Sequence, residues 1–153
     1  MTHKNLSIRP MTREDFYRFN PAEKHVEMHN FAKANPAFVD MLMLDGNGGF
    51  VLADEEDNII MLMGGQTISH CTAEVWLAFA VGFETYVKSC IKALRVLITE
   101  KMPNHVYRLE ANIYIDDFQA LNLLEKCLGF SIVGVRRKLG AKGEDIVLLE
   151  RLL

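Results

Sequence analysis

Residues 108–130, RLEANIYIDDFQALNLLEKCLGF, predict a strand, a tight turn and an amphipathic helix in direct succession. Apolar and polar residues alternate over positions 109–115, which is the period of a strand with one apolar face. Asp116 then predicts the N-cap of a helix, because Gln119 falls three positions later, as in a capping box. The helix has one apolar face, which is made by Ala120, Leu121, Leu124, Cys127 and Leu128.

The end of this helix is also encoded locally. Gly129 is placed to be the left-handed residue that follows a helix, and Phe130 can fold back on Leu124. Two further strands are expected at residues 130–139 and 146–153, joined by a glycine-containing turn.

Upstream of this segment the chain alternates between helix and strand patterns. Two helix starts are expected, one at Thr12 and one at Asn20, where Pro21 would take the first helical position. The glycine pair at positions 64 and 65 predicts a bulge or a close backbone approach. The other expected elements are strands at 6–10, 50–53, 59–63 and 72–81 (the last buried on both faces), a turn at 46–49, and a helix from about residue 85 to Pro103.

The bulk composition describes an ordinary globular protein. The 153 residues are half apolar, carry a formal charge of −3 and contain no linker, which favours one α/β (α+β) domain over residues 1–153. The negative charge and the short basic stretches argue against nucleic-acid binding, and no apolar run has the length of a membrane span. No secretory leader is expected either. The three unpaired cysteines, Cys71, Cys90 and Cys127, favour a reducing, cytoplasmic setting.

A histidine pair in HVEMH raises the question of a metal site. His25 and His29 stand one helical turn apart, which is a spacing that can chelate zinc. No third ligand follows at a recognisable distance, so an exposed helix is the preferred interpretation and no metal is expected.

The C-terminal half resembles the GNAT acyltransferase superfamily. The resemblance rests on a strand, a helix that ends in Gly-Phe, and a hairpin before an apolar strand; its residues are Ala120, Leu124, Gly129, Phe130, Gly143, Asp145 and the run 146–149. It implies a single GNAT-like domain with a mixed sheet of six to seven strands and about four helices. It also implies transfer of an acetyl group from acetyl-CoA to an amine by direct attack.

The resemblance assigns the cofactor residues. The strand backbone at Phe79, Ala80 and Val81 would hold the pantetheine, and the following loop would hold the pyrophosphate at a helix start. Gly82, Thr85 and Val87 occupy the three positions of the phosphate-loop motif, so two of its glycines are replaced. Asp117 stands where the family frequently has an asparagine.

The resemblance also points to catalytic residues. Glu74 and His70 are candidate bases on or just before the fourth strand, where family bases often lie; a solvated or salt-bridged Glu74 is the structural alternative. The thiolate-protonating tyrosine of many members is Leu124 here. Tyr114 is the nearest replacement, with a half-exposed strand aromatic as its alternative.

The N-terminal half resembles a narrower group, the small GNAT-like proteins encoded by tailed bacteriophages. The shared features are I-R-P at positions 8–10, D-F-x-x-F-x-P-A at 15–22, Gly-Gly at 64–65 and Trp76. Two functions follow from this resemblance. One is an acetyltransferase for a small-molecule or peptide amine, and the other is an inactive GNAT-like scaffold, such as a phage virion or binding protein. A homodimer or virion proteins are the partners implied.

Overall fold

The computed structural model describes residues 5–42, 49–140 and 142–153, so most of the turn expected at 46–49 lies outside it. In this part of the chain seven strands hydrogen bond in the order β1-β2-β3-β4-β5-β7-β6, and five α-helices accompany them. Parallel and antiparallel pairs both occur, so the expected mixed α/β sheet is confirmed. The chain divides into two compact units, Met1–Gln66 with Trp76–Ala93 and Thr67–Val75 with Leu94–Leu153. The single domain stays a prediction.

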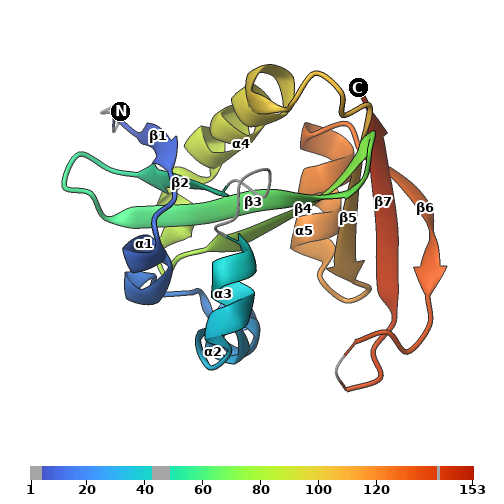
Figure 1. The fold of residues 1–153 in the computed structure, drawn as a ribbon, viewed down its shortest axis with the longest axis horizontal. Helices are drawn as coiled ribbons and strands as arrows, with labels where there is room; N and C mark the ends of the chain where they lie inside the picture. Colours follow the sequence, from blue (N-terminus) through green and yellow to red (C-terminus); the bar gives the residue numbers. More distant parts are fainter. Residues whose placement is uncertain (1–4, 43–48, 141) are drawn as a thin grey trace. The chain divides into compact units, whose positions relative to one another are not determined.

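The first unit is built on an antiparallel set of strands. Helices lie below and above these strands in Figure 1. A buried apolar cluster of the unit includes Phe16, Phe19, Val51 and Leu62, with Trp76 packed against it. The elements that contribute to the unit are β1 (Ser7–Pro10), α1 (Arg13–Arg18), α2 (Val26–Lys33), α3 (Pro36–Leu42), β2 (Gly49–Ala53), β3 (Ile59–Ser69), β4 (Thr72–Phe79) and α4 (Val87–Val96).

The helix starts of this unit divide into one success and one error. Thr12 caps α1 in the expected capping box with Asp15. Asn20 caps nothing: Pro21 forms an isolated antiparallel bridge with Ala80, and α2 begins only at Val26 after a short 3-10 turn. The sequence pattern Asn-Pro-Ala-Glu fits a helix start. In the structure, however, the backbone of residues 20–22 hydrogen bonds to residues 79–81 at the end of β4.

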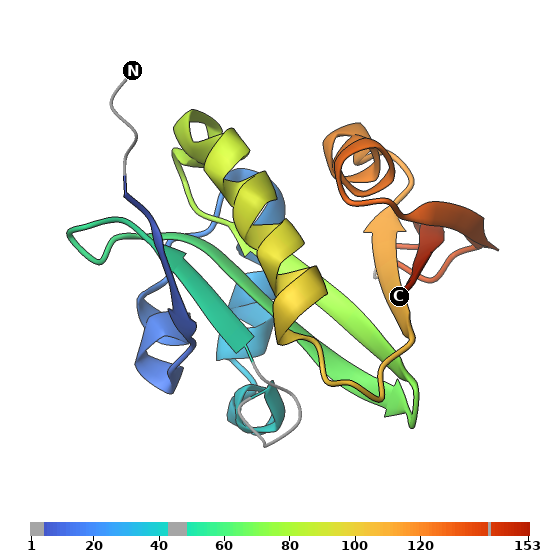
Figure 2. The same ribbon diagram turned by 90° about the horizontal axis from the view of Figure 1, so that it is seen from above.

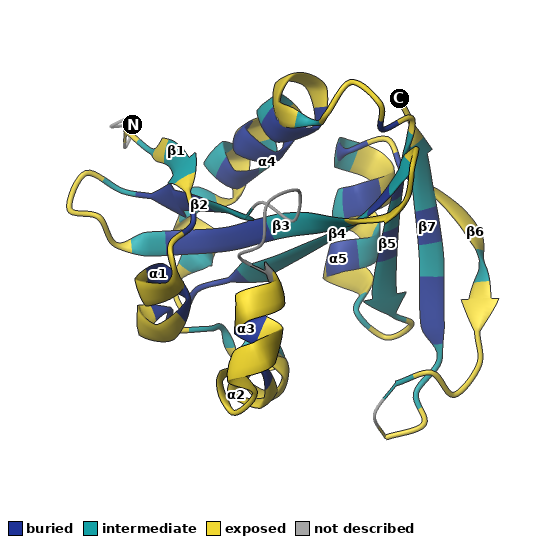
Figure 3. Cartoon of the chain, viewed as in Figure 1, coloured by how far each residue is buried: buried dark blue, intermediate teal, exposed yellow. Residues whose placement is uncertain are grey.

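Two details of β3 and β4 also depend on tertiary packing. Gly64 makes the expected close approach, since a Cβ there would lie 2.7 Å from the Trp76 ring. The register shift in the pairing of β2 with β3 is not at the glycine pair but between Leu52 and Ala53. The prediction that β4 is buried on both faces is wrong. In β4 only Ala73 and Phe79 are buried, and the residues between them are half-buried. Figure 3 likewise colours part of this strand as intermediate.

The second unit is built around β5. This strand (Arg108–Tyr114) pairs antiparallel with β7 (Ile146–Leu152) along its whole length, and β6 (Ser131–Arg136) adds to the other edge of β7. The pairing of β5 with β4 is parallel and covers three residue pairs in the described chain, from Thr72–Arg108 to Glu74–Glu110. The predicted neighbourhood of these strands and their partial pairing are confirmed. Figure 2 shows α5 (Phe118–Asn122) on one face of β5 and β7.

The helical segment that opened the sequence argument begins one residue later than expected. Asp117, not Asp116, is the N-cap, because its side chain accepts from the Ala120 N–H. The segment ends as predicted: Gly129 is left-handed, with φ of 72°, and the Phe130 N–H donates to the Leu124 carbonyl at 3.0 Å. No helix in the described residues is long and apolar enough to cross a membrane.

Candidate functional site

The end of β4 carries the backbone expected to hold pantetheine, and it is already paired. The Ala80 N–H donates to Ile60 of β3 at 2.9 Å. Because alternate residues of a strand direct their polar backbone groups to opposite edges, Phe79 and Val81 serve the other edge. There the Ala22 N–H donates to the Phe79 carbonyl at 2.8 Å, and the Val81 N–H donates to the Asn20 carbonyl at 3.0 Å. We call residues 20–22 the edge segment. Its hydrogen bonds therefore use the backbone carbonyl of Phe79 and the backbone N–H of Val81, which were expected to bind the cofactor.

The Phe79 side chain is part of the packing of the first unit. Its ring stacks on Phe83 with centroids 4.3 Å apart, the His25 ring lies 6.0 Å away, and the Lys24 ammonium lies 5.8 Å from its centroid. Phe79 is 5% exposed. Only its backbone is placed to contact a ligand, and only after the edge segment leaves.

The helix start after β4 is open. Gly82 has φ of 83° and nothing lies within 4 Å of the position that a Cβ would take. It begins a 3-10 turn, Phe83–Tyr86, that has no side-chain cap, and the Thr85 hydroxyl donates to the Gly82 carbonyl at 3.3 Å. Backbone N–H groups at a helix start attract anions. The Phe83 N–H already donates to the Ala80 carbonyl at 3.2 Å, so this loop has fewer N–H groups left for a phosphate than its open surroundings suggest. The strand edge beside it can take pantetheine only if the edge segment leaves.

The second unit brings three carboxylates into register. Glu74 of β4 lies opposite Glu110 of β5, which lies opposite Glu150 of β7. Residues opposite one another in neighbouring strands project from the same face. We call Glu74, Glu110 and Glu150 the carboxylate row. Arg108 bridges two of its members, with its Nη2 at 2.9 Å from Glu110 and 3.0 Å from Glu150.

Glu74 has a partner of its own. Its Oε1 accepts a hydrogen bond from the Asn112 side-chain amide at 3.3 Å. The Asn112 Oδ1 and the Arg108 Nε are buried and have no hydrogen-bond partner among the described residues. Buried polar atoms are nearly always hydrogen bonded. The polar atoms around the row are therefore only partly satisfied by the chain itself.

The other two candidate catalytic residues lie away from the row. His70 is exposed in the turn between β3 and β4, where its ring stacks on His105 with centroids 5.5 Å apart. Tyr114 lies opposite Ile146 at the far end of β5. Four residues of strand, about 13 Å, separate it from Glu110. Neither His70 nor Tyr114 is a member of the carboxylate row, and the catalytic role of all three candidates stays a prediction.

Sequence reasoning missed Glu110, Glu150, Arg108 and Asn112. A signal was present, since Arg108, Glu110 and Asn112 alternate along β5 and must share a face. The register between three strands that are distant in sequence could not be read from that alternation. Asp117 belongs to the same unit, and its carboxylate caps α5 with an oxygen 3.1 Å from the Ala120 nitrogen.

His29 of α2 is buried, which corrects the exposed setting expected for it, whereas His25 lies in the 3-10 turn before α2 and is half-buried. His29 is 7% exposed, and its ring contacts Phe16 and Phe19 at centroid distances of 4.8 and 5.3 Å. Burial, together with the nearby Lys33 charge, lowers the pKa of His29. In the described ranges no three His, Cys, Asp or Glu side chains are placed to hold a metal ion.

Comparisons with known proteins support the fold. No protein-family model and no curated protein matches the chain. Among solved structures, a chimera of the spermidine N-acetyltransferase SpeG from Vibrio cholerae and hSSAT is similar, with 19% identity, a TM-score of 0.71 and coverage of 96% of this chain and 95% of that chain.

Two further structures agree with this. A candidate phosphinothricin N-acetyltransferase is 22% identical, with a TM-score of 0.68 over 97% of this chain and 99% of that one. The spermidine/spermine N-acetyltransferase SpeG from Vibrio cholerae, in complex with manganese ions, is 19% identical, with a TM-score of 0.67 over 96% and 92% of the two chains. The chain therefore has the fold of N-acetyltransferase structures, as the GNAT resemblance implied.

Proposed function

We propose that the protein is a GNAT-type N-acetyltransferase that moves an acetyl group from acetyl-CoA to a small-molecule or peptide amine. The observation that carries this proposal is Glu74, a strand carboxylate oriented by Asn112 and flanked by the rest of the carboxylate row. The fold shared with N-acetyltransferase structures supports the reaction class.

Glu74 acts as the general base. An amine is protonated near neutral pH and must lose a proton before it attacks a carbonyl, and a carboxylate can accept that proton directly or through one water. Asn112 fixes one carboxylate oxygen at 3.3 Å, while the Oε2 has no hydrogen bond in the described chain. One oxygen is thus positioned by the protein and the other is available to the proton.

The charge of the row selects the acceptor. Arg108 pairs with Glu110 and Glu150, while no cationic side chain among the described residues forms an ion pair with Glu74. Partly buried negative charge of this kind raises the local concentration of cations. A cationic amine is therefore favoured over a neutral or acidic acceptor.

Acetyl-CoA, when bound, supplies the acyl group as a thioester. The open loop at Gly82 and Thr85 would hold its phosphates. The backbone of residues 79–81 would hold its pantetheine in the enzyme, which requires the edge segment to leave β4. Tyr114 and His70 have no part in this proposal.

The test measures transfer from radiolabelled acetyl-CoA to a panel of diamines, polyamines and lysine peptides. Glu74→Gln should lower kcat/KM about 100-fold or more, since a general base contributes roughly that factor. Glu125→Gln is the matched control, because Glu125 is an exposed carboxylate of the same unit outside the row. Equal activity of both variants would contradict the role of Glu74.

The second candidate function is a GNAT-like scaffold without catalysis, such as a binding protein or a virion component of a bacteriophage. The closed edge at residues 79–81 favours it, because this backbone is satisfied without a cofactor. Titration calorimetry with acetyl-CoA separates the two functions. A complete lack of binding, also in a variant that weakens the edge segment, would favour the scaffold. The enzyme would be cytoplasmic, and the scaffold would travel with the virion.

A further inference from the structure

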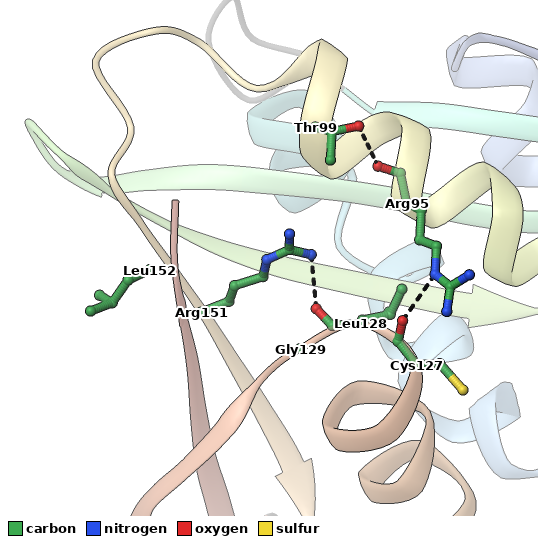
Figure 4. Close-up of a pocket in the computed structure, with 7 residues that line it drawn as sticks. All are labelled: Arg95, Thr99, Cys127, Leu128, Gly129, Arg151 and Leu152. Atoms are coloured by element: carbon green, nitrogen blue, oxygen red, sulfur yellow. Dashed lines mark hydrogen bonds between the residues drawn. The ribbon is translucent and has the colours of Figure 1, made fainter.

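A hollow in the second unit is lined by two arginines. It measures about 430 Å³. It lies at the end of the helical segment 118–127, which begins with α5 and is called the α5 segment below. Figure 4 shows Arg95 of α4 and Arg151 of β7 entering it from two different elements. Cys127, Leu128, Gly129, Thr99 and Leu152 complete its lining.

Both guanidinium groups are held in place by the backbone. The Arg95 Nε donates to the Cys127 carbonyl at 3.1 Å, and the Arg151 Nη1 donates to the Leu128 carbonyl at 2.8 Å. These are consecutive carbonyls at the end of a helical segment, where cations are stabilised. A guanidinium has five N–H donors, so each arginine spends one here and keeps the others.

Among the described residues, no carboxylate pairs with either of these two arginines. The lining residues include no Asp or Glu, and neither arginine forms an ion pair in the described part of the chain. Arg9 and Arg108, by contrast, lie 2.6 to 3.0 Å from carboxylate oxygens. Capping of the helix end alone would use one donor per arginine. Capping therefore does not explain why two positive charges lie in one hollow without a counter-ion, in a chain whose formal charge is −3.

We propose that this hollow is a binding site for a phosphate group, as in inorganic phosphate or a phosphomonoester. Two guanidinium groups enter it, and an arginine can bind phosphate oxygens through two parallel hydrogen bonds. The site uses none of the residues assigned to acetyl transfer, so it stands or falls independently of that reaction.

Binding is tested on the full chain by NMR titration with phenyl phosphate, inorganic phosphate and benzoate at constant ionic strength. Phosphate binding should be saturable and tighter than that of benzoate, both for phenyl phosphate and for inorganic phosphate, and it should shift the Arg95 Nε–H and the amides of residues 127–129. Arg95→Gln and Arg151→Gln should each weaken it about tenfold, which is the loss of one charge-assisted hydrogen bond.

Arg137→Gln is the matched control, because it removes one positive charge from an exposed position outside the hollow. Arg151→Lys keeps the charge and should still lose most of the affinity, since the fork geometry is gone. Unliganded melting curves show whether any variant is merely unfolded. Shifts that are linear in concentration, equal affinity for benzoate, or equal weakening by Arg137→Gln would overturn the proposal.

Discussion

Asp15 of the first unit and Glu74 of the second are both carboxylates removed from full solvent exposure, but the chain satisfies them to different degrees. Asp15 accepts from Arg9 with both oxygens at 2.6 and 2.7 Å, and Thr12 and Arg18 add further hydrogen bonds. Glu74 accepts one bond at 3.3 Å in the described residues, from an amide whose own oxygen is unpaired. Both oxygens of Asp15 thus accept hydrogen bonds within the fold, whereas Glu74 can still accept hydrogen bonds from a ligand.

The largest effect expected from this contrast is on stability. Asp15→Asn should lower the free energy of unfolding by about 3 kcal/mol, because it removes the buried carboxylate of an ion pair with Arg9 and weakens a capping box. Denaturant unfolding measures the loss. Asp40→Asn is the control: Asp40 pairs with Arg13, and both side chains are about half exposed, so little change is expected. Similar losses at both positions would remove the contrast.

The Asp15 carboxylate should also make the free energy of unfolding fall at acidic pH. Hydrogen bonds from Arg9, the main cause, hold the pKa of Asp15 well below its usual range. The folded state thus binds this proton less readily than the unfolded chain, so the contribution of Asp15 is present above the ordinary carboxyl pKa of about 4 and disappears as the pH falls through the lower, folded value. Asp15→Asn should flatten the stability profile in this acid range.

Glu74→Gln should show the opposite balance. Its free energy of unfolding should change by less than about 1 kcal/mol, since only one long hydrogen bond is altered. Acetyl transfer should fall as described above. A stability loss as large as that of Asp15→Asn would mean that Glu74 is structural, and the two carboxylates would then no longer differ in kind.

Buried His29 should make the stability of the protein depend on pH near neutrality. Its pKa is lowered mainly by burial, so the unfolded chain takes up a proton near pH 6.5 that the folded chain does not. Stability should therefore decline as the pH falls from 7 through the ordinary histidine pKa of about 6.5 towards 5. His29→Leu should remove this slope in melting temperature, and His105→Asn, at an exposed position, should keep it. A slope that survives in His29→Leu would assign it to another group.

The smallest effect concerns the edge segment. Ala22 has φ of −58°, which suits proline, so Ala22→Pro removes the N–H that donates to Phe79 and changes little else. If acetyl-CoA must displace this segment, its affinity should rise about fivefold, the equivalent of one net hydrogen bond. Calorimetry measures the change, and Ala22→Ser, which keeps the N–H, should bind like the natural chain. Unchanged or weaker binding by Ala22→Pro would show that the segment does not compete.

The sequence by itself determined the elements whose signals are local. The Thr12 capping box, the left-handed Gly129 and the buried Leu124 follow from residues within a few positions of one another, because caps and helix faces are set by local geometry. The same local patterns supported the GNAT resemblance and, through it, the mixed sheet. Glu74 became a candidate base because it stands at a strand position where bases of the family often lie, and its role stays a prediction.

Only the tertiary structure decided how distant backbones compete and align. Residues 20–22 read locally as a helix start, yet they pair with β4, since a strand edge offers hydrogen bonds that a three-residue pattern does not reveal. The carboxylate row needs the register of three strands, and the arginine hollow needs α4 and β7 to meet the end of the α5 segment. These features join residues that are far apart in sequence, and packing alone brings them together.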